Sequence, residues 1–203
     1  FLRAIAVVDV HGNVLVSTTA SESGMRINMD KLGPRGPAGR SSMGPLIMGR
    51  GLAAIRATGA AQEVPQGLAF IPLLQSFVSD AGRPLVLVGL ANPDAFSNFQ
   101  YLTLETESFD SVITTYRGTV LAGSRAGGRL VGSSVGGIPV FTHFLPAREH
   151  ATYIGKGALG ERQILAFRTS GTKPIVVIVE ESYSQAAWNW FYSAGALLGV
   201  GCV

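Results

Sequence analysis

The chain has 203 residues, of which 47% are hydrophobic and 14% are charged, and its formal net charge is +3. This composition excludes an intrinsically disordered chain and allows a packed core in one large domain or in two small ones. The single cysteine, Cys202, excludes an internal disulfide.

A repeated pattern predicts two modules of the same kind. Residues 7–16 and 113–122 both have the pattern of a strand, a tight turn with Gly12 or Gly118, and a second strand. A closing pair of strands then follows in each half of the chain. Repetition of one β-rich unit is typical of a modular architecture.

We therefore predict an α+β fold of two tandem modules, residues 1–103 and 104–190. Each module is expected to hold a mainly antiparallel sheet with short flanking helices, near the usual size of a small domain. The elements expected in the first module are strands 2–10 and 14–18, a short helix 25–32, a loop 33–42, a short strand 45–48, a helical or irregular piece 51–58, strands 68–78 and 84–91, and a helix from 95 to 104.

A basic stretch lies between the two hairpins of the first module. From residue 26 to residue 56 the sequence has six basic residues and one acidic residue, and no Phe, Tyr or Trp. The absence of aromatic residues on which bases could stack argues against nucleic acid. A solvated surface is one interpretation. The other is a site for a small anion, which arginine holds with a planar fork, with Arg40 and Arg50 as cations and Ser41 and Gln75 as neutral partners.

The second module repeats this order. The elements expected in it are strands 111–116 and 119–122, a Gly/Ser-rich loop 123–137, an element of unassigned type at 140–145, strands 151–155, 163–169 and 174–180, and a terminal helix.

Two short motifs in the second module have a catalytic or cofactor interpretation. Residues 132–136 match G-x-S-x-G, but they lie in a Gly/Ser-rich loop, whereas a hydrolase needs Ser134 on a strand-to-helix elbow. Residues 155–160 match G-x-G-x-x-G, with Glu180 and Glu181 about 20 residues further on. Because a strand and not a helix follows these glycines, a turn is the better interpretation, and we predict neither a cofactor nor a metal.

The end of the chain indicates a membrane. No charged residue follows Glu181, and Trp188, Trp190 and Tyr192 lie where an interfacial aromatic belt would precede a span. We expect residues 191–203 to begin a transmembrane helix, with a buried C-terminal helix as the alternative.

The strand–Asp–x–x–Gly–x–strand pattern around Asp9 and Gly12, its weaker copy, the closing strand pairs and the terminal helix together resemble the double Cache (PAS-like) sensor domains of bacteria. The resemblance implies a periplasmic, non-catalytic region of an inner-membrane receptor, held by flanking membrane helices and acting as a homodimer. It also implies that the membrane-distal module, residues 1–103, binds a small molecule and that the C-terminal helix passes the signal on. The expected output is a diguanylate cyclase, a histidine kinase or a chemotaxis region. A serine hydrolase using Ser134 and a structural spacer without a ligand remain as alternatives.

Overall fold

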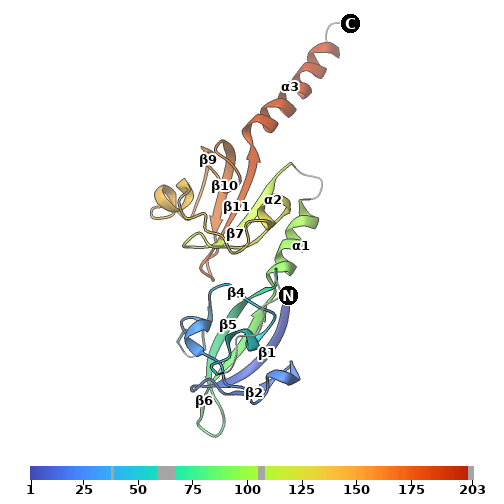
Figure 1. The fold of residues 1–203 in the computed structure, drawn as a ribbon. Helices are drawn as coiled ribbons and strands as arrows, with labels where there is room; N and C mark the ends of the chain where they lie inside the picture. The colour runs from blue at the N-terminus through green and yellow to red at the C-terminus, as the bar shows by residue number, and fades with distance from the viewer. Residues whose placement is uncertain (38, 59–66, 105–107, 201–203) are drawn as a thin grey trace. The chain divides into compact units, whose positions relative to one another are not determined.

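The computed structural model describes residues 1–37, 39–58, 67–104 and 108–200, with side chains described up to residue 193. The chain divides into two compact units, Phe1–Phe96 and Ser97–Val203. Each unit is built on one antiparallel sheet (Figure 1). The fold is therefore α+β with two antiparallel sheets and few helices. The two units divide after Phe96, inside α1 (Pro93–Thr103), and the module boundary expected at residue 103 stays a prediction.

The first sheet has the strand order β2-β1-β6-β5-β3, and β4 also pairs with β5. Its two long hairpins, β1–β2 and β5–β6, are brought together by pairing of β1 with β6. The elements of this part are β1 (Leu2–Asp9), β2 (Val14–Ser17), η1 (Ala20–Glu22), η2 (Met29–Leu32), β3 (Ser41–Met43), β4 (Ile47–Met48), η3 (Leu52–Ile55), β5 (Ala69–Val78), β6 (Pro84–Ala91) and α1.

One face of the first sheet forms the core of its unit. In β1 the side chains of Ala4, Ala6 and Val8 are buried, while the residues between them are more exposed, as alternation along a strand requires. This face packs against the stretch between the hairpins, where each fully buried aliphatic side chain contributes about 1.5–3 kcal/mol. The side chains that this stretch adds to the core are Ile27, Leu32, Leu52 and Ile55.

The second sheet has the order β8-β7-β11-β10-β9, which repeats the arrangement of the first strand for strand. Here β7–β8 takes the place of β1–β2, and β10–β11 takes the place of β5–β6. The elements are β7 (Asp110–Thr115), β8 (Val120–Gly123), α2 (Arg125–Gly128), η4 (Val140–Phe144, a single π-helical turn), β9 (His150–Gly155), β10 (Gln163–Thr169), β11 (Ile175–Ser182) and α3 (Tyr183–Val200).

The first hairpins of the two units have the same kind of turn. Gly12 and Gly118 both have a positive φ, of 88° and 79°. Asp9 Oδ1 accepts a hydrogen bond from Asn13 N at 2.9 Å, and Thr115 Oγ1 accepts one from Thr119 N at 3.1 Å in the equivalent place. Both hairpins also carry a register shift at the same point, between Val7 and Val8 and between Ile113 and Thr114. The repeat seen in the sequence is thus a repeat in structure.

The differences from the predicted elements lie between the hairpins. The helix expected at 25–32 is only the 3₁₀ segment Met29–Leu32, because Arg26 and Ile27 bridge to Asn13 and Arg56 as extended chain. The end of the loop expected at 33–42 forms strand β3 against β5. The Gly/Ser-rich loop expected at 123–137 contains α2.

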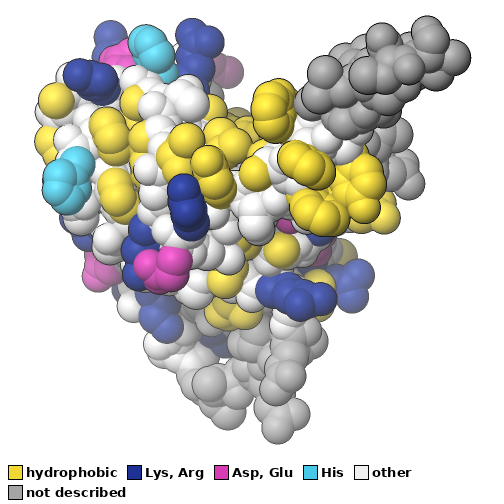
Figure 2. Space-filling view, turned by 90° about the horizontal axis from the view of Figure 1, so that it is seen from above, with side chains coloured by type: hydrophobic (Ala, Val, Ile, Leu, Met, Phe, Trp, Pro, Cys, Tyr) yellow, Lys and Arg dark blue, Asp and Glu magenta, His cyan; other side chains and the backbone are white. Residues whose placement is uncertain are grey.

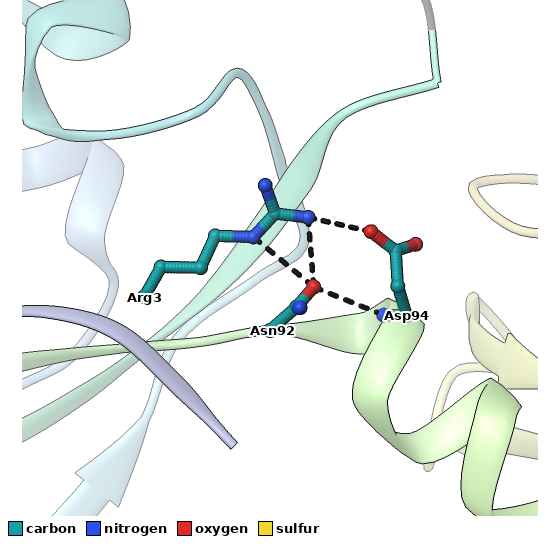
Figure 3. Close-up of polar contacts among 3 residues, drawn as sticks. All are labelled: Arg3, Asn92 and Asp94. Carbon is teal, nitrogen blue, oxygen red and sulfur yellow. Dashed lines mark hydrogen bonds and ion pairs between the residues drawn. The ribbon is translucent and has the colours of Figure 1, made fainter.

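The start of α1 is fixed by three side chains (Figure 3). Arg3 Nη2 donates to Asn92 Oδ1 at 2.7 Å and to Asp94 Oδ2 at 2.6 Å. Asn92 Oδ1 also accepts from Asp94 N at 3.1 Å and so caps the helix. A cap contributes about 1 kcal/mol, and an exposed ion pair contributes about 0–1 kcal/mol. Of the two partners of Arg3, Asn92 therefore contributes more to the stability of the start of α1.

The chain continues from β11 directly into α3 (Figure 1). Four large aromatic side chains of α3 are 60% to 71% exposed: Trp188, Trp190, Phe191 and Tyr192. Apolar side chains, drawn in yellow, lie at many places on the face that is seen from above in Figure 2. Within the described ranges, no helix is both long and apolar enough to cross a membrane.

Two glycines with a similar positive φ, Gly12 and Gly24, test the hairpin turn. Gly24 has φ +81° and open space where a Cβ would stand, so Gly24→Ala should cost about 1–2 kcal/mol for its backbone alone. A Cβ on Gly12 would overlap Ile27 O and disturb the bond from Ile27 N to Gly12 O. Gly12→Ala should therefore cost about 1–3 kcal/mol more than Gly24→Ala, measured by urea unfolding. Equal costs would contradict this account of the turn.

Candidate functional site

The four residues predicted to hold an anion all lie at the surface of the first unit. Ser41 on β3 and Gln75 on β5 are direct partners across the sheet. Arg40 precedes β3, Arg50 lies between β4 and η3, and all four side chains are exposed. The structure thus brings Ser41 next to Gln75 and places Arg50 in a different loop. Ligand binding by this set stays a prediction.

A buried carboxylate holds the loop that carries Arg50. Glu22, at the end of η1, is only 3% exposed. Its Oε1 accepts from Leu52 N at 2.6 Å, and its Oε2 accepts from Ser17 Oγ at 3.0 Å. A Cβ on Gly51 would overlap Glu22 Oε1, so glycine allows the backbone to come this close. The Glu22 carboxylate therefore fixes the first residue of η3, two positions after Arg50.

The second unit has a carboxylate held in the same way. Glu180 on β11 is 1% exposed, and its oxygens accept from Ala158 N at 2.6 Å and from Leu159 N at 3.1 Å. A Cβ on Gly157 would overlap Glu180 Oε2. In both units, then, a backbone N–H next to a glycine donates to a buried glutamate.

The surroundings of Glu180 shift two pKa values. Burial raises the pKa of Glu180, the hydrogen bonds from Ala158 and Leu159 lower it, and the charge of Asp110 raises it, with a net result above the usual value. Burial, together with the charge of Glu180, raises the pKa of Tyr153 to about 12. Tyr153 OH donates to Lys156 O at 2.9 Å and is neutral at physiological pH.

The G-x-G-x-x-G stretch is the connection between β9 and β10, as the turn interpretation predicts. Gly157 N donates to Gly160 O at 2.8 Å across the turn. The N–H groups of Ala158 and Leu159, in the same turn, donate to the carboxyl oxygens of Glu180. The glycine-rich loop does bind a carboxyl group, but that group belongs to the protein itself.

Ser134 forms an isolated antiparallel bridge with Thr119 and is exposed, away from any strand-to-helix elbow. Its Oγ accepts from Gly136 N at 3.4 Å. His143 Nδ1 lies 2.7 Å from Thr142 Oγ1, and His150 begins β9. This arrangement does not resemble a Ser–His relay. Among the described residues, no group of three or more His, Cys, Asp or Glu is placed to hold a metal.

An open depression of about 400 Å³ lies over β9 and β10. Arg168 and His150 are partners across these strands and form one end of it. Both side chains are exposed, so the depression has the positive charge of Arg168 at its rim and offers little enclosure. It is lined by His150, Ala151, Thr152, Ala166, Phe167 and Arg168.

The sequence analysis did not predict that Glu22 and Glu180 are buried and hold loops on their sheets. A glutamate directly after the apolar run 175–179 was a usable signal for Glu180, because a charge that continues a buried apolar strand needs a partner. Glu22 gave no such signal, since it stands among Ser and Thr residues.

No protein-family model and no curated protein matches the chain. Solved structures do match its fold. The extracellular domain of rpHK1S-Z16, assigned as a histidine kinase, is 15% identical with a TM-score of 0.63, over 90% of this chain and 71% of that one. The sensor domain of the Vibrio cholerae histidine kinase DctB is 13% identical with a TM-score of 0.52, over 88% and 71%.

A chemoreceptor matches as well. The ligand-binding domain of Pseudomonas fluorescens CtaA, in complex with L-alanine, is 14% identical with a TM-score of 0.54, over 90% of this chain and 73% of that one. The chain therefore has the fold of extracellular sensor domains of histidine kinases and chemoreceptors, and the resemblance to Cache-type domains is confirmed for the fold.

A double-mutant cycle tests the Glu22 contact. Glu22→Ala should cost about 1–3 kcal/mol of unfolding free energy, because Leu52 N would be buried without an acceptor. Gly51→Ala should be costly in the wild type and nearly neutral in the Glu22→Ala background, where the overlapping atoms are gone. Gly137→Ala, which has open space around the new methyl group, is the control. Additive costs would show that Gly51 is needed for another reason.

Proposed function

We propose that this chain is the periplasmic ligand-sensing region of a bacterial transmembrane receptor. The observation that supports this most directly is the pair of sheets with the same strand order, which aligns over 90% of the chain with the extracellular domain of rpHK1S-Z16. The two units are then tandem PAS-like modules, with residues 1–103 membrane-distal and 104–190 membrane-proximal. The region itself is not an enzyme.

The proposed ligand is a small anion bound by the distal module. All six basic side chains between residues 26 and 56 are exposed and can meet a ligand from solvent. CtaA in complex with L-alanine and Mlp24 with asparagine show that neighbours in fold bind small molecules that carry a carboxylate. Arg40, Ser41, Arg50 and Gln75 are the candidate contacts. A ligand would signal only through different affinities for two arrangements of this module.

The proposed output path is α3. The helix follows β11 without a break, so a displacement of that strand moves the helix directly. Its exposed aromatic side chains fit a membrane interface. In this proposal residues 191–203 begin a membrane span, the receptor is a homodimer, and the helix leads to a histidine kinase, a chemotaxis region or a diguanylate cyclase.

A serine hydrolase and a ligand-free spacer are the competing functions. The exposed position of Ser134, in a bridge to Thr119 and not on a strand-to-helix elbow, does not favour the hydrolase. Ser134→Ala should leave the hydrolysis of p-nitrophenyl acetate at the background rate of the wild-type protein. A loss of turnover in this variant would support the hydrolase.

A thermal-shift screen separates a sensor from a spacer. A small carboxylate or phosphorylated compound at 100 times its Kd should stabilise the folded protein by about 2.7 kcal/mol, by mass action. The shift should disappear in Arg40→Ala or Arg50→Ala and persist in Arg117→Ala, which removes an exposed arginine from the second unit. If no carboxylate, phosphorylated compound, amino acid or polyamine produces a shift, a spacer or a protein-sensing role is favoured instead.

A further inference from the structure

One loop of the second unit contacts both Glu180 and the start of α3. The loop, residues 156–162, gives Glu180 its hydrogen bonds through Ala158 and Leu159. At its other end, the Arg162 guanidinium lies 4.0 Å from the centre of the Tyr183 ring. Tyr183 N donates to Arg162 O at 3.2 Å. Tyr183 is the first residue of α3, so this loop joins a buried acid to the helix.

Glu180 is held by backbone N–H groups in a place that water scarcely reaches. Two N–H donors suit an ionised carboxylate with two accepting oxygens. A protonated carboxyl group loses acceptor strength at one oxygen, and charge-assisted hydrogen bonds are about twice as strong as neutral ones. These bonds favour the ionised form, but burial disfavours it more, so the pKa of Glu180 is raised while the loop covers it, and the covered state binds the proton more tightly.

The charges around Glu180 do not fix it in the ionised state. Asp110, its partner on β7, is also acidic, and accepts from Ser124 Oγ and Ala126 N. Lys156 Nζ pairs with Glu161 at 2.8 Å. The titratable and charged groups of the elements packed around it are Asp110 on β7, Tyr153 on β9, Lys156, Glu161 and Arg162 in the loop, and Arg125 on α2, which donates to Leu104 O.

We propose that Glu180 and loop 156–162 form a proton-responsive latch that sets the position of the first turn of α3. With Glu180 protonated, the loop stays over the buried carboxyl group and against β11, and Arg162 holds Tyr183. With Glu180 ionised, the charge gains water when the loop moves away, so the hold of the loop on Tyr183 weakens. The role of α3 as an output rests on the proposed function, but the latch does not need a ligand in the distal module.

The sign of the pH effect follows from burial. The pKa of Glu180 is raised in the folded protein, so the folded state binds this proton more tightly than the unfolded state. The stability from this group is fully present below the unfolded pKa and is lost as pH rises through the folded pKa. Between these two values, acid protonates Glu180 without unfolding the unit.

Amide NMR of the ¹⁵N-labelled 203-residue chain, titrated from pH 4 to pH 9, tests the latch. The Ala158 and Leu159 amide protons should shift with a common midpoint above about 4.3, the ordinary value of a glutamate. Tyr183 N–H should follow with the same midpoint. Glu180→Gln should remove the shared transition, while Glu181→Gln should keep it, since Glu181 is the adjacent carboxylate and contacts Ser108 Oγ.

Three results would overturn the latch. These are Ala158 and Leu159 amides that do not move or that follow an ordinary carboxyl midpoint, a transition that survives Glu180→Gln, or a Tyr183 amide that stays still while the loop titrates. If Glu180→Gln does not fold, the wild-type titration alone decides. No ligand is added, so a failed ligand screen and a failed latch are separate results.

Discussion

Each unit of this fold depends on a buried carboxylate that has to keep its backbone hydrogen bonds. An ionised group away from water costs several kcal/mol unless it is paired or hydrogen-bonded. Glu22 meets this need with Leu52 N and Ser17 Oγ, and Glu180 meets it with Ala158 N and Leu159 N. Because the donors sit on loops, the same bonds that satisfy the acids also fix the loops on their sheets.

This arrangement holds the sheets and the loops by different interactions. The hairpins are held by many ladder bonds and by apolar packing, whereas each loop is tied down at a glutamate. In the first unit that loop adjoins Arg50, a candidate ligand contact. In the second it adjoins Tyr183 at the start of the helix. A small chemical change at one of these loops should therefore displace the backbone more than the same change on a strand.

The hairpins could be predicted from local sequence patterns, whereas contacts between residues distant in sequence could not. Alternating apolar residues and the turns at Gly12 and Gly118 are signals within a few residues, so β1, β2, β7 and β8 were predictable. Strand β3 was not, because it forms only by pairing with Leu73, Leu74 and Gln75 in a stretch rich in Gly and Pro. The bond from Leu52 to Glu22 spans 30 positions, and the bond from Ala158 to Glu180 spans 22. Charge alone identified Arg40 and Arg50 as candidates, but it carried no information about whether a pocket encloses them.

The shared register shift in the two first hairpins has a consequence for how such a chain changes over evolution. A bulge places two residues opposite one and increases the local twist. Inserting or deleting one residue in either hairpin would erase it and turn the following side chains to the wrong face. We therefore expect length variation to be confined to the stretches between hairpins, and the β1–β2 and β7–β8 segments to be the units that can be exchanged between the two halves.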